Sequence, residues 1–370
     1  MKVKRSKGLY IHIPFCKYIC SYCDFCKFDE KRVYNIDKYI DVLVSEISNY
    51  RQYFSEIDTI YIGGGTPNYL SLNNLKKLFD SLKDIKPLEY TIEINSDIYN
   101  KEQGELFVYA GINRVSIGAQ TFEPSLINIL KREHNYNITK ECVDDLRNKG
   151  INNINIDMIY AIPTQTIKQL KNDLKNVSSL NPTHISYYSL ILEEDTFLYY
   201  QYVNKKINLI DEDTDYIMNK EVNEYLENNG YMQYEISNYA RNCNYSIHNL
   251  KYWNMEDYIG VGLSACGYYN NTRYSNTKIL NSYLKGKYET EEEVLDASRT
   301  LCDTLMLGLR KICGVNIKKI EQEYRVNLLE VFPEILKKID EGLLEVFEGN
   351  LRLTKDKGIY LANQVFMIFV

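Results

Sequence analysis

The sequence predicts an α/β protein, an open and partial β/α barrel of about six parallel βα units with a winged-helix-like C-terminal cap. Short β-type runs alternate with amphipathic helical stretches, which is the pattern of βαβ units around a parallel sheet. Chemically capable polar residues follow successive β-type runs. The 370 residues, 45% hydrophobic and 25% charged, are enough for one large core and a smaller second one.

The predicted strands are six apolar runs at residues 9–13, 59–62, 90–94, 114–117, 154–158 and 184–190. Helical periodicity fills the gaps at residues 36–53, 72–82, 139–149, 167–179 and 213–229. Gly111, Gly150 and Gly230 mark the C-termini of helical stretches. Strand and helix are therefore expected to alternate as far as residue 230.

The residues that follow each run indicate where a site would lie. Three cysteines follow the first run, three glycines the second, and acidic or amide side chains the later ones. In a β/α barrel these loops converge on one face and form the active site. A doubly wound sheet is the alternative, but the first strand–helix turn lacks a dinucleotide-binding fingerprint.

Beyond the barrel the sequence pattern changes twice. Residues 231–269 interleave aromatic and polar side chains irregularly, which indicates an extension that helps to build the site. Helical patterns at 297–309, 316–323 and 329–341 then precede a hairpin at 343–353 around Gly349 and Asn350, which resembles a winged helix. The predicted domains are a barrel core at 1–230, a site extension at 231–290 and a helical C-terminal domain at 291–370.

Charge and cysteine usage argue against several classes of protein. Lys and Arg number 44 against 50 Asp and Glu, and the net charge of −6 argues against a nucleic-acid binder with a broad basic field. The N-terminus shows no secretory signal, and no apolar run approaches the roughly 20 residues of a transmembrane helix. We therefore expect a cytoplasmic protein, in which nine cysteines serve as ligands and buried thiols rather than disulfides.

Cys16, Cys20 and Cys23 form a C-x3-C-x2-C motif directly after the first predicted strand. Three thiolates at this spacing can bind three irons of a [4Fe-4S] cluster and leave the fourth iron open for a substrate or cofactor. A zinc site or three buried thiols are the alternatives, although structural zinc needs four protein ligands. Cys26 is the alternative fourth ligand, but we expect it to be a nearby thiol.

The cysteine loop, within Tyr10-Ile-His-Ile-Pro-Phe-Cys16 and followed by Tyr22 and Asp24-Phe25, resembles that of the radical S-adenosylmethionine enzymes. It is more closely similar to the oxygen-independent coproporphyrinogen III oxidase family and its HemW-type heme chaperone branch. The likeness runs from Leu9 nearly to the C-terminus. In that family S-adenosylmethionine chelates the open iron. Reduction of the cluster then cleaves S-adenosylmethionine and yields a 5'-deoxyadenosyl radical.

The resemblance implies a set of residues that bind S-adenosylmethionine. A glycine run after a strand brings backbone groups close to a ligand, although alone it would more often be a tight turn. Arginine can pair with a carboxylate, and acidic side chains accept ribose hydroxyls; a surface salt-bridge set is the alternative. The implied residues are Tyr10, Tyr22, Gly64, Gly65, Thr66, Glu93, Gln120, Arg132 and Asp157.

The second motif, His248-Asn-Leu-Lys-Tyr252-Trp253, resembles the HNxxYW signature of the heme chaperone branch. An imidazole can ligate heme iron, and the aromatic side chains could pack on a porphyrin. A buried, hydrogen-bonded histidine is the alternative. Cys266 stands where the chaperones typically have a histidine in the next motif, so His248 and Cys266 are both candidate heme ligands.

Three functions follow from the resemblance. The first is a chaperone that binds a [4Fe-4S] cluster, S-adenosylmethionine and heme and passes heme to an acceptor apoprotein, with a respiratory protein expected. The second is an oxygen-independent coproporphyrinogen III oxidase, and the third is another radical enzyme with an unknown substrate. Phe25, where the oxidases have a fourth cysteine, and the short N-terminus favour the chaperone. Whether the chain is an enzyme, and whether it forms a homodimer, are left open by the sequence.

Overall fold

Six parallel strands form the barrel wall in the order that the sequence predicts. They are β1 (Lys7–Ile13), β4 (Ile57–Gly64), β5 (Glu89–Asn95), β6 (Arg114–Gln120), β7 (Asn153–Tyr160) and β8 (His184–Ser189). Each pairs in parallel with the next. Their order in the sheet follows the chain, whereas a doubly wound sheet reverses at a switch point, so the barrel prediction is confirmed. The computed structural model describes residues 7–29 and 35–370.

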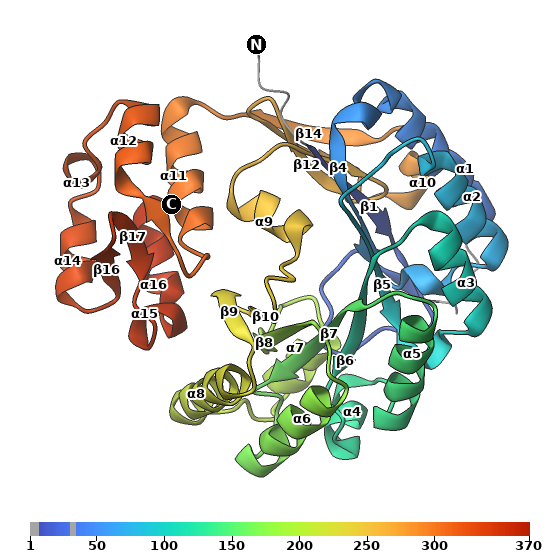
Figure 1. Ribbon diagram of the computed structural model, residues 1–370, viewed down its shortest axis with the longest axis horizontal. Coiled ribbons are helices and arrows are strands. Elements are labelled where there is room, and N and C mark those ends of the chain that lie inside the picture. Colours follow the sequence, from blue (N-terminus) through green and yellow to red (C-terminus); the bar gives the residue numbers. More distant parts are fainter. Residues whose placement is uncertain (1–6, 30–34) are drawn as a thin grey trace.

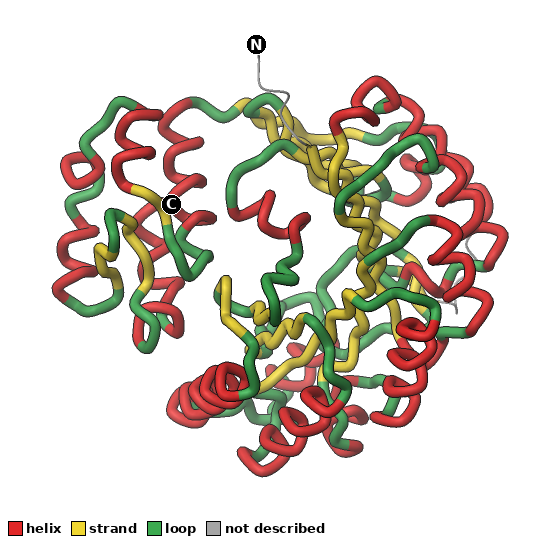
Figure 2. The backbone as a smooth tube through the Cα atoms, viewed as in Figure 1, coloured by secondary structure: helices red, strands yellow, loops and turns green. Residues whose placement is uncertain are grey.

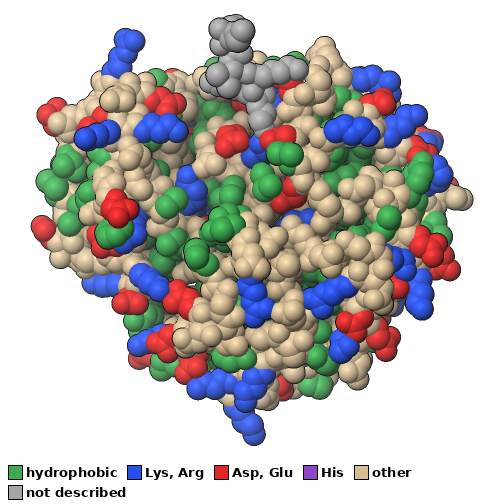
Figure 3. Space-filling model, viewed as in Figure 1, with side chains coloured by type: hydrophobic (Ala, Val, Ile, Leu, Met, Phe, Trp, Pro, Cys, Tyr) green, Lys and Arg blue, Asp and Glu red, His purple; other side chains and the backbone are tan. Residues whose placement is uncertain are grey.

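Helices cover the convex side of this curved wall, so the strands face inward on the other side (Figures 1 and 2). The helices of this part are α1 (Ile36–Asn49), α2 (Leu72–Leu82), α3 (Lys101–Ala110), α4 (Pro124–Leu130), α5 (Tyr136–Asn148), α6 (Ile167–Ser179), α7 (Phe197–Val203) and α8 (Glu212–Asn228). The apolar faces of α1, α2, α3, α5, α6 and α8 share one hydrophobic core with the strands, whereas α4 packs in a separate small cluster. On the face shown in Figure 3, acidic and basic side chains are interspersed rather than gathered into one field.

The ends of the helices follow from local sequence. Thr166 and Gln169 form a reciprocal capping box at the start of α6, which satisfies two backbone donors. The predicted helix over residues 36–53 is confirmed as far as Asn49 and was wrong in its last four residues, because α1 ends there and a 3-10 turn (Arg51–Glu56) follows. The tighter turn keeps Phe54 in the core while the chain turns into β4.

Residues 231–290 extend the same sheet at both edges. The added elements are β9 (Met232–Glu235), β10 (Asn238–Ala240), α9 (Ile247–Trp253), β11 (Tyr258–Val261), β12 (Cys266–Tyr269), β13 (Thr272–Asn276), α10 (Leu280–Tyr283) and β14 (Glu289–Val294). β11 pairs in parallel with β1, and β10 pairs antiparallel with β8. The described residues thus form a 12-stranded sheet, and α9 lies on its concave side (Figure 1).

The C-terminal cap has a hydrophobic core of its own. It consists of α11 (Ala297–Gly308), β15 (Val315–Asn316), α12 (Ile317–Tyr324), α13 (Leu328–Val331), α14 (Glu334–Asp340), β16 (Leu344–Phe347), β17 (Asn350–Leu353), α15 (Lys357–Tyr360) and α16 (Ala362–Phe366). The single helix predicted over 329–341 was wrong, because Pro333 lacks the N–H that a helix interior needs and separates α13 from α14. None of the helices within residues 7–29 and 35–370 is long and apolar enough to span a membrane.

Candidate functional site

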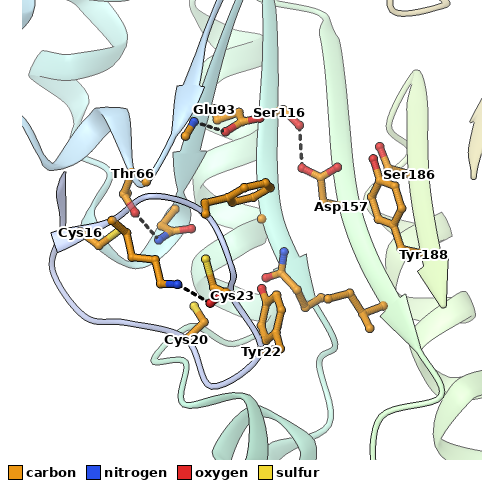
Figure 4. A pocket seen from close by; sticks show the side chains of 18 of the residues that line it. Cys16, Cys20, Tyr22, Cys23, Thr66, Glu93, Ser116, Asp157, Ser186 and Tyr188 are labelled. Carbon is orange, nitrogen blue, oxygen red and sulfur yellow. Dashed lines mark hydrogen bonds between the residues drawn. The ribbon is translucent and has the colours of Figure 1, made fainter. Parts of the chain in front are cut away.

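A cavity of about 450 Å³ lies on the concave side of the barrel wall, between the cysteine loop and the inner faces of the strands (Figure 4). Its lining brings together eleven predicted site residues: Cys16, Cys20, Tyr22, Cys23, Gly64, Gly65, Thr66, Glu93, Gln120, Arg132 and Asp157. Tyr10, His248 and Cys266 are not part of this lining. The full lining draws on all six wall strands, through inward residues of the strands or through the loops that follow them, as the barrel topology requires.

The cysteine loop is closed at its base and fixed along its length. Short strands β2 (Phe15–Cys16) and β3 (Phe28–Asp29) pair in parallel at the base. The Ser21 backbone N–H donates to the Leu130 carbonyl at 3.1 Å, and its hydroxyl donates to the Ile129 carbonyl at 2.7 Å. These bonds tie the loop to α4 and hold its three cysteines against the cavity.

The three thiols are chemically suited to a cluster that supplies its own positive charge. Burial raises the pKa of Cys16 to about 12 and that of Cys23 to about 11, so a bound metal must displace their protons. Arg132 Nη1 donates to Cys20 Sγ at 3.5 Å, and Lys27 donates to the Cys23 carbonyl. Among the described residues no three His, Cys, Asp or Glu side chains are placed to hold one metal ion. In a cluster each thiolate binds its own iron.

The glycine loop after β4 packs directly on the cysteine loop. Gly65 N donates to the Ile13 carbonyl at 2.7 Å, and Thr66 N donates to the Phe15 carbonyl at 2.8 Å. A Cβ at Gly65 would stand 2.9 Å from Cys16 Sγ. At Gly64, where φ is +112°, a Cβ would stand 2.5 Å from the His12 ring. Only glycine therefore allows this close approach of the two loops.

Tyr10 supports the site indirectly, through its contact with His12. Its hydroxyl lies 2.9 Å from His12 Nδ1, and His12 Nε2 lies 2.9 Å from the Cys26 carbonyl. Because a carbonyl only accepts, Nε2 donates, and the neutral ring accepts from Tyr10 at Nδ1. Burial lowers the pKa of His12, which keeps the ring neutral. The Tyr10–His12 pair thus anchors the end of the cysteine loop to β1. Its predicted contact with S-adenosylmethionine stays a prediction.

Two carboxylates face the cavity from β5 and β7 (Figure 4). Glu93 accepts from the Tyr61 hydroxyl at 2.8 Å and from Gly64 N at 3.1 Å, and burial raises its pKa to about 7. Asp157 accepts from the Ser116 hydroxyl at 2.7 Å and from Asn155 Nδ2 at 2.8 Å. Fixed carboxylates of this kind can accept hydrogen bonds from the hydroxyls of a ligand.

Gln120 supplies an acceptor without a partner. It is buried at the end of β6 with φ +59°, and its Oε1 makes no hydrogen bond within the described part of the chain. Asp173 fixes the following turn by accepting from the Thr121 hydroxyl and from Phe122 N, both at 2.7 Å. An unsatisfied buried acceptor in the lining, beside the glycine loop and three thiols, fits a site for S-adenosylmethionine and an iron–sulfur cluster.

His248 and Cys266 differ sharply in accessibility. His248 is fully buried, with Nδ1 2.9 Å from Thr59 Oγ1 and Nε2 2.8 Å from the Tyr252 hydroxyl. Burial, aided by Lys251 and Arg114, lowers the pKa of His248 to about 3, so the ring is neutral. Cys266, at the start of β12, is exposed. Both ring nitrogens of the histidine therefore already have partners, whereas the thiol is reachable.

Several lining residues were missed from the sequence. Tyr61, Arg114, Asn155, Ser186 and Tyr188 all reach the cavity from inward positions of the strands. The available signal was polar side chains at alternate positions of otherwise apolar strands, since alternate residues share one face.

The family comparisons agree with the geometry. Residues 10–177 match the Radical SAM superfamily, and residues 300–361 match the HemN C-terminal domain. The chain is 35% identical to the heme chaperone HemW of Lactococcus lactis subsp. lactis (strain IL1403), with 100% of this chain and 98% of that protein covered. It is 36% identical to HemW of Bacillus subtilis (strain 168), covering 98% and 99%.

A solved structure agrees with the fold. Coproporphyrinogen III oxidase (HemN) from Escherichia coli superposes with a TM-score of 0.85 at 24% identity, covering 99% of this chain and 90% of that one. At this identity the likeness bears on the fold alone. The sequence identity to the HemW proteins extends over the full length of the chain, so it is the stronger guide to its family. The chain belongs to the HemW heme chaperone family, within the radical SAM superfamily.

Proposed function

We propose that this chain binds a [4Fe-4S] cluster, S-adenosylmethionine and heme, and that it passes heme to an acceptor apoprotein. The observation that carries the proposal is the full-length identity of about a third to several proteins named heme chaperone HemW. A chaperone of this kind needs a site that is open enough to release a large, apolar ligand. The expected acceptor is a respiratory protein that the chain can contact from the cytoplasm.

The cofactors would occupy the cavity described above. Cys16, Cys20 and Cys23 would hold three irons of the cluster, with the glycine loop and Tyr22 beside it. Gln120 and the carboxylates of β5 and β7 would bind the polar groups of S-adenosylmethionine. When bound, the cluster would supply an open iron for the amino-acid end of S-adenosylmethionine and an electron for its reductive cleavage.

The porphyrin would lie at the mouth of the cavity. Four large apolar side chains of the cavity lining are exposed there: Ile19 (38%), Phe25 (61%), Tyr188 (40%) and Ile191 (70%). An exposed apolar rim around a polar cavity is typical of a ligand-binding surface. Phe25 occupies the position at which the resemblance places a fourth cysteine in the oxidases. The rim therefore supports binding of an apolar ring.

Cys266 is the iron ligand that we favour. His248 would have to give up a hydrogen bond to Thr59 or Tyr252 and leave the core before it could reach iron. The exposed Cys266 thiol needs no such rearrangement. Thiolate and imidazole are both established axial ligands of heme, and they give different spectra. Spectroscopy can therefore distinguish the two.

The test is an anaerobic heme titration of the cluster-reconstituted protein. The proposal expects about one heme per chain, a Soret band that changes in Cys266→Ala, and an unchanged band in the exposed-cysteine control Cys243→Ala. Failure of the wild-type protein to bind heme would overturn the proposal. If His248→Gln alone changed the band, the proposed ligand would be wrong while heme binding would stand.

The alternative function is enzymatic. An oxygen-independent coproporphyrinogen III oxidase would decarboxylate propionate groups in the same cavity. The match of residues 300–361 to the HemN C-terminal domain favours this alternative. The discriminating assay measures release of carbon dioxide from coproporphyrinogen III in the presence of S-adenosylmethionine and a reductant. The chaperone proposal expects none, whereas sustained release would replace it by the oxidase.

A further inference from the structure

Arg114 is a buried cation that has no hydrogen-bond or ion-pair partner in the described part of the chain. It opens β6 and lines the inner end of the cavity, and only 1% of its surface is exposed. Within residues 7–29 and 35–370 its guanidinium forms no hydrogen bond or ion pair, and its Nε is fully buried and unsatisfied. Burying an unpaired charge strongly destabilises a fold, so a guanidinium in this state calls for an anion.

The carboxylates of Glu89 and Asp157 interact with the charge of Arg114, but both already accept hydrogen bonds from other groups. Glu89 accepts from Ile247 N at 2.8 Å and from His248 N at 2.9 Å, where it caps the start of α9. Asp157 accepts from Ser116 and Asn155. Burial alone would lower the pKa of Arg114, but Glu89, together with two tyrosines and Asp157 at longer range, raises it. The guanidinium therefore stays charged, and neither carboxylate pairs with it.

The histidines and tyrosines around Arg114 are neutral. Burial, and then Arg114 itself, lowers the pKa of His184 far below its usual value, and His248 is neutral for similar reasons. Burial raises the pKa of the facing hydroxyls of Tyr61 and Tyr234, so both are protonated. The carboxylates of Glu89, Asp157 and Glu93 accept hydrogen bonds from other groups, and within the described part of the chain none of them bonds to the guanidinium of Arg114.

One neighbouring side chain can join the guanidinium in holding an oxyanion. Asn249 lines the cavity, and among the described residues its side-chain amide donates to no other group. Ser116, Asn155 and Ser186 already donate to Asp157 or to one another, so they hold the wall of the cavity in place. The other cations of the lining, Arg132 and Lys27, are hydrogen-bonded at the opposite end, beside the cysteine loop. A planar guanidinium binds a carboxylate through two parallel hydrogen bonds, which gives both affinity and orientation.

We propose that the inner end of the cavity is a carboxylate subsite anchored by Arg114. Resting on the proposed function, the carboxylate is a propionate of heme that reaches down from the cavity mouth. The methionine carboxylate of S-adenosylmethionine is the other source of the same chemistry. In either case Arg114 sets the orientation of the ligand that enters the cavity.

The subsite itself is tested with propionate and its neutral analogue propionamide on the ligand-free, full-length protein. Propionate should raise the melting temperature of the wild type with increasing concentration, because it binds only the folded state, and propionamide should not. Arg114→Met should lose this response and should melt at or above the wild-type temperature, since it removes an unpaired charge. Arg299→Met, which removes an exposed cation, should keep the response.

Equal responses of the wild type and Arg114→Met to propionate would overturn the subsite, as would equal responses of the wild type to propionate and propionamide. Should Arg114→Met fail to fold, Arg114→Lys keeps the charge but loses the two-pronged geometry. That variant should respond to propionate more weakly than the wild type, and a full response would count against a bidentate anchor.

Two binding experiments identify the ligand that supplies the carboxylate. The wild type should bind heme roughly 10- to 100-fold more tightly than heme dimethyl ester, and Arg114→Met should bind both equally. Preference for S-adenosylmethionine over 5'-methylthioadenosine, lost in Arg114→Met, would instead assign the carboxylate to the cofactor. Absence of heme binding by every variant would refute the proposed function, and the propionate response would still decide the subsite.

Discussion

Replacing Gly65 by alanine tests the close packing of the two loops that build the cluster site. The added Cβ would stand 2.9 Å from Cys16 Sγ and 2.9 Å from the carbonyl oxygens of Ile13 and Phe15. Those carbonyls accept the hydrogen bonds that join the loops, so they cannot move aside without breaking them. Two such bonds contribute about 1 kcal/mol each, and overpacking costs roughly 1–3 kcal/mol.

The summed cost of about 3–5 kcal/mol is below the usual stability of a domain, so the chain should still fold. Displacing the cysteine loop at a cost of about 3 kcal/mol corresponds to roughly 100-fold weaker cluster binding. The assay is iron content and visible absorption after anaerobic reconstitution, with circular dichroism as the folding check. Gly111→Ala is the control for destabilisation away from the site: its φ of +78° makes alanine strain the backbone, but a Cβ there meets no atom within 4 Å, so iron uptake should be retained. Full iron uptake by Gly65→Ala would refute the reasoning.

Three further predictions concern the cysteines, the buried carboxylate of β5 and the core. Cys23→Ala should abolish iron uptake and Cys26→Ala should retain it; the reverse result would contradict the ligand assignment. Affinity for S-adenosylmethionine should rise as the pH increases through about 7, because ionised Glu93 accepts hydroxyl hydrogen bonds better than its protonated form. Calorimetry at several pH values should show a flatter dependence of affinity on pH for Glu93→Gln. An identical profile would count against this role. Glu46→Ala removes a buried carboxylate that accepts three hydrogen bonds, and denaturant unfolding should show a loss of about 3 kcal/mol or more; a loss below 1 kcal/mol would be inconsistent.

The barrel wall was predictable because its strands are long and apolar enough to be recognised locally. The short strands β9 to β13 were not, since three to five residues do not establish a period of two. β11 is also parallel to β1 although some 250 residues separate them in sequence, and nothing in either segment specifies that pairing. Long-range pairing of short strands depends on the finished sheet.

The cysteine and glycine motifs were predictable as parts of the site because their chemistry is contained in a few consecutive residues. Arg114 was missed because its importance depends on three strands and α9 closing around it. The available signal was that the polar Arg114 and Ser116 alternate with the apolar Val115 and Ile117 along the strand. Similarly, the sequence left open whether His248 is a ligand or a core residue, and the distant Thr59 that holds its ring could not be anticipated.

The most direct test of the central claim is heme transfer. The cluster-reconstituted protein is loaded with one equivalent of heme, mixed anaerobically with the apo form of a respiratory b-type heme protein, and separated from it by size. The account predicts that heme leaves this chain and appears in the acceptor with the acceptor's own spectrum. Heme that stays on the chain in the presence of excess acceptor, or a chain that never takes up heme, would contradict it.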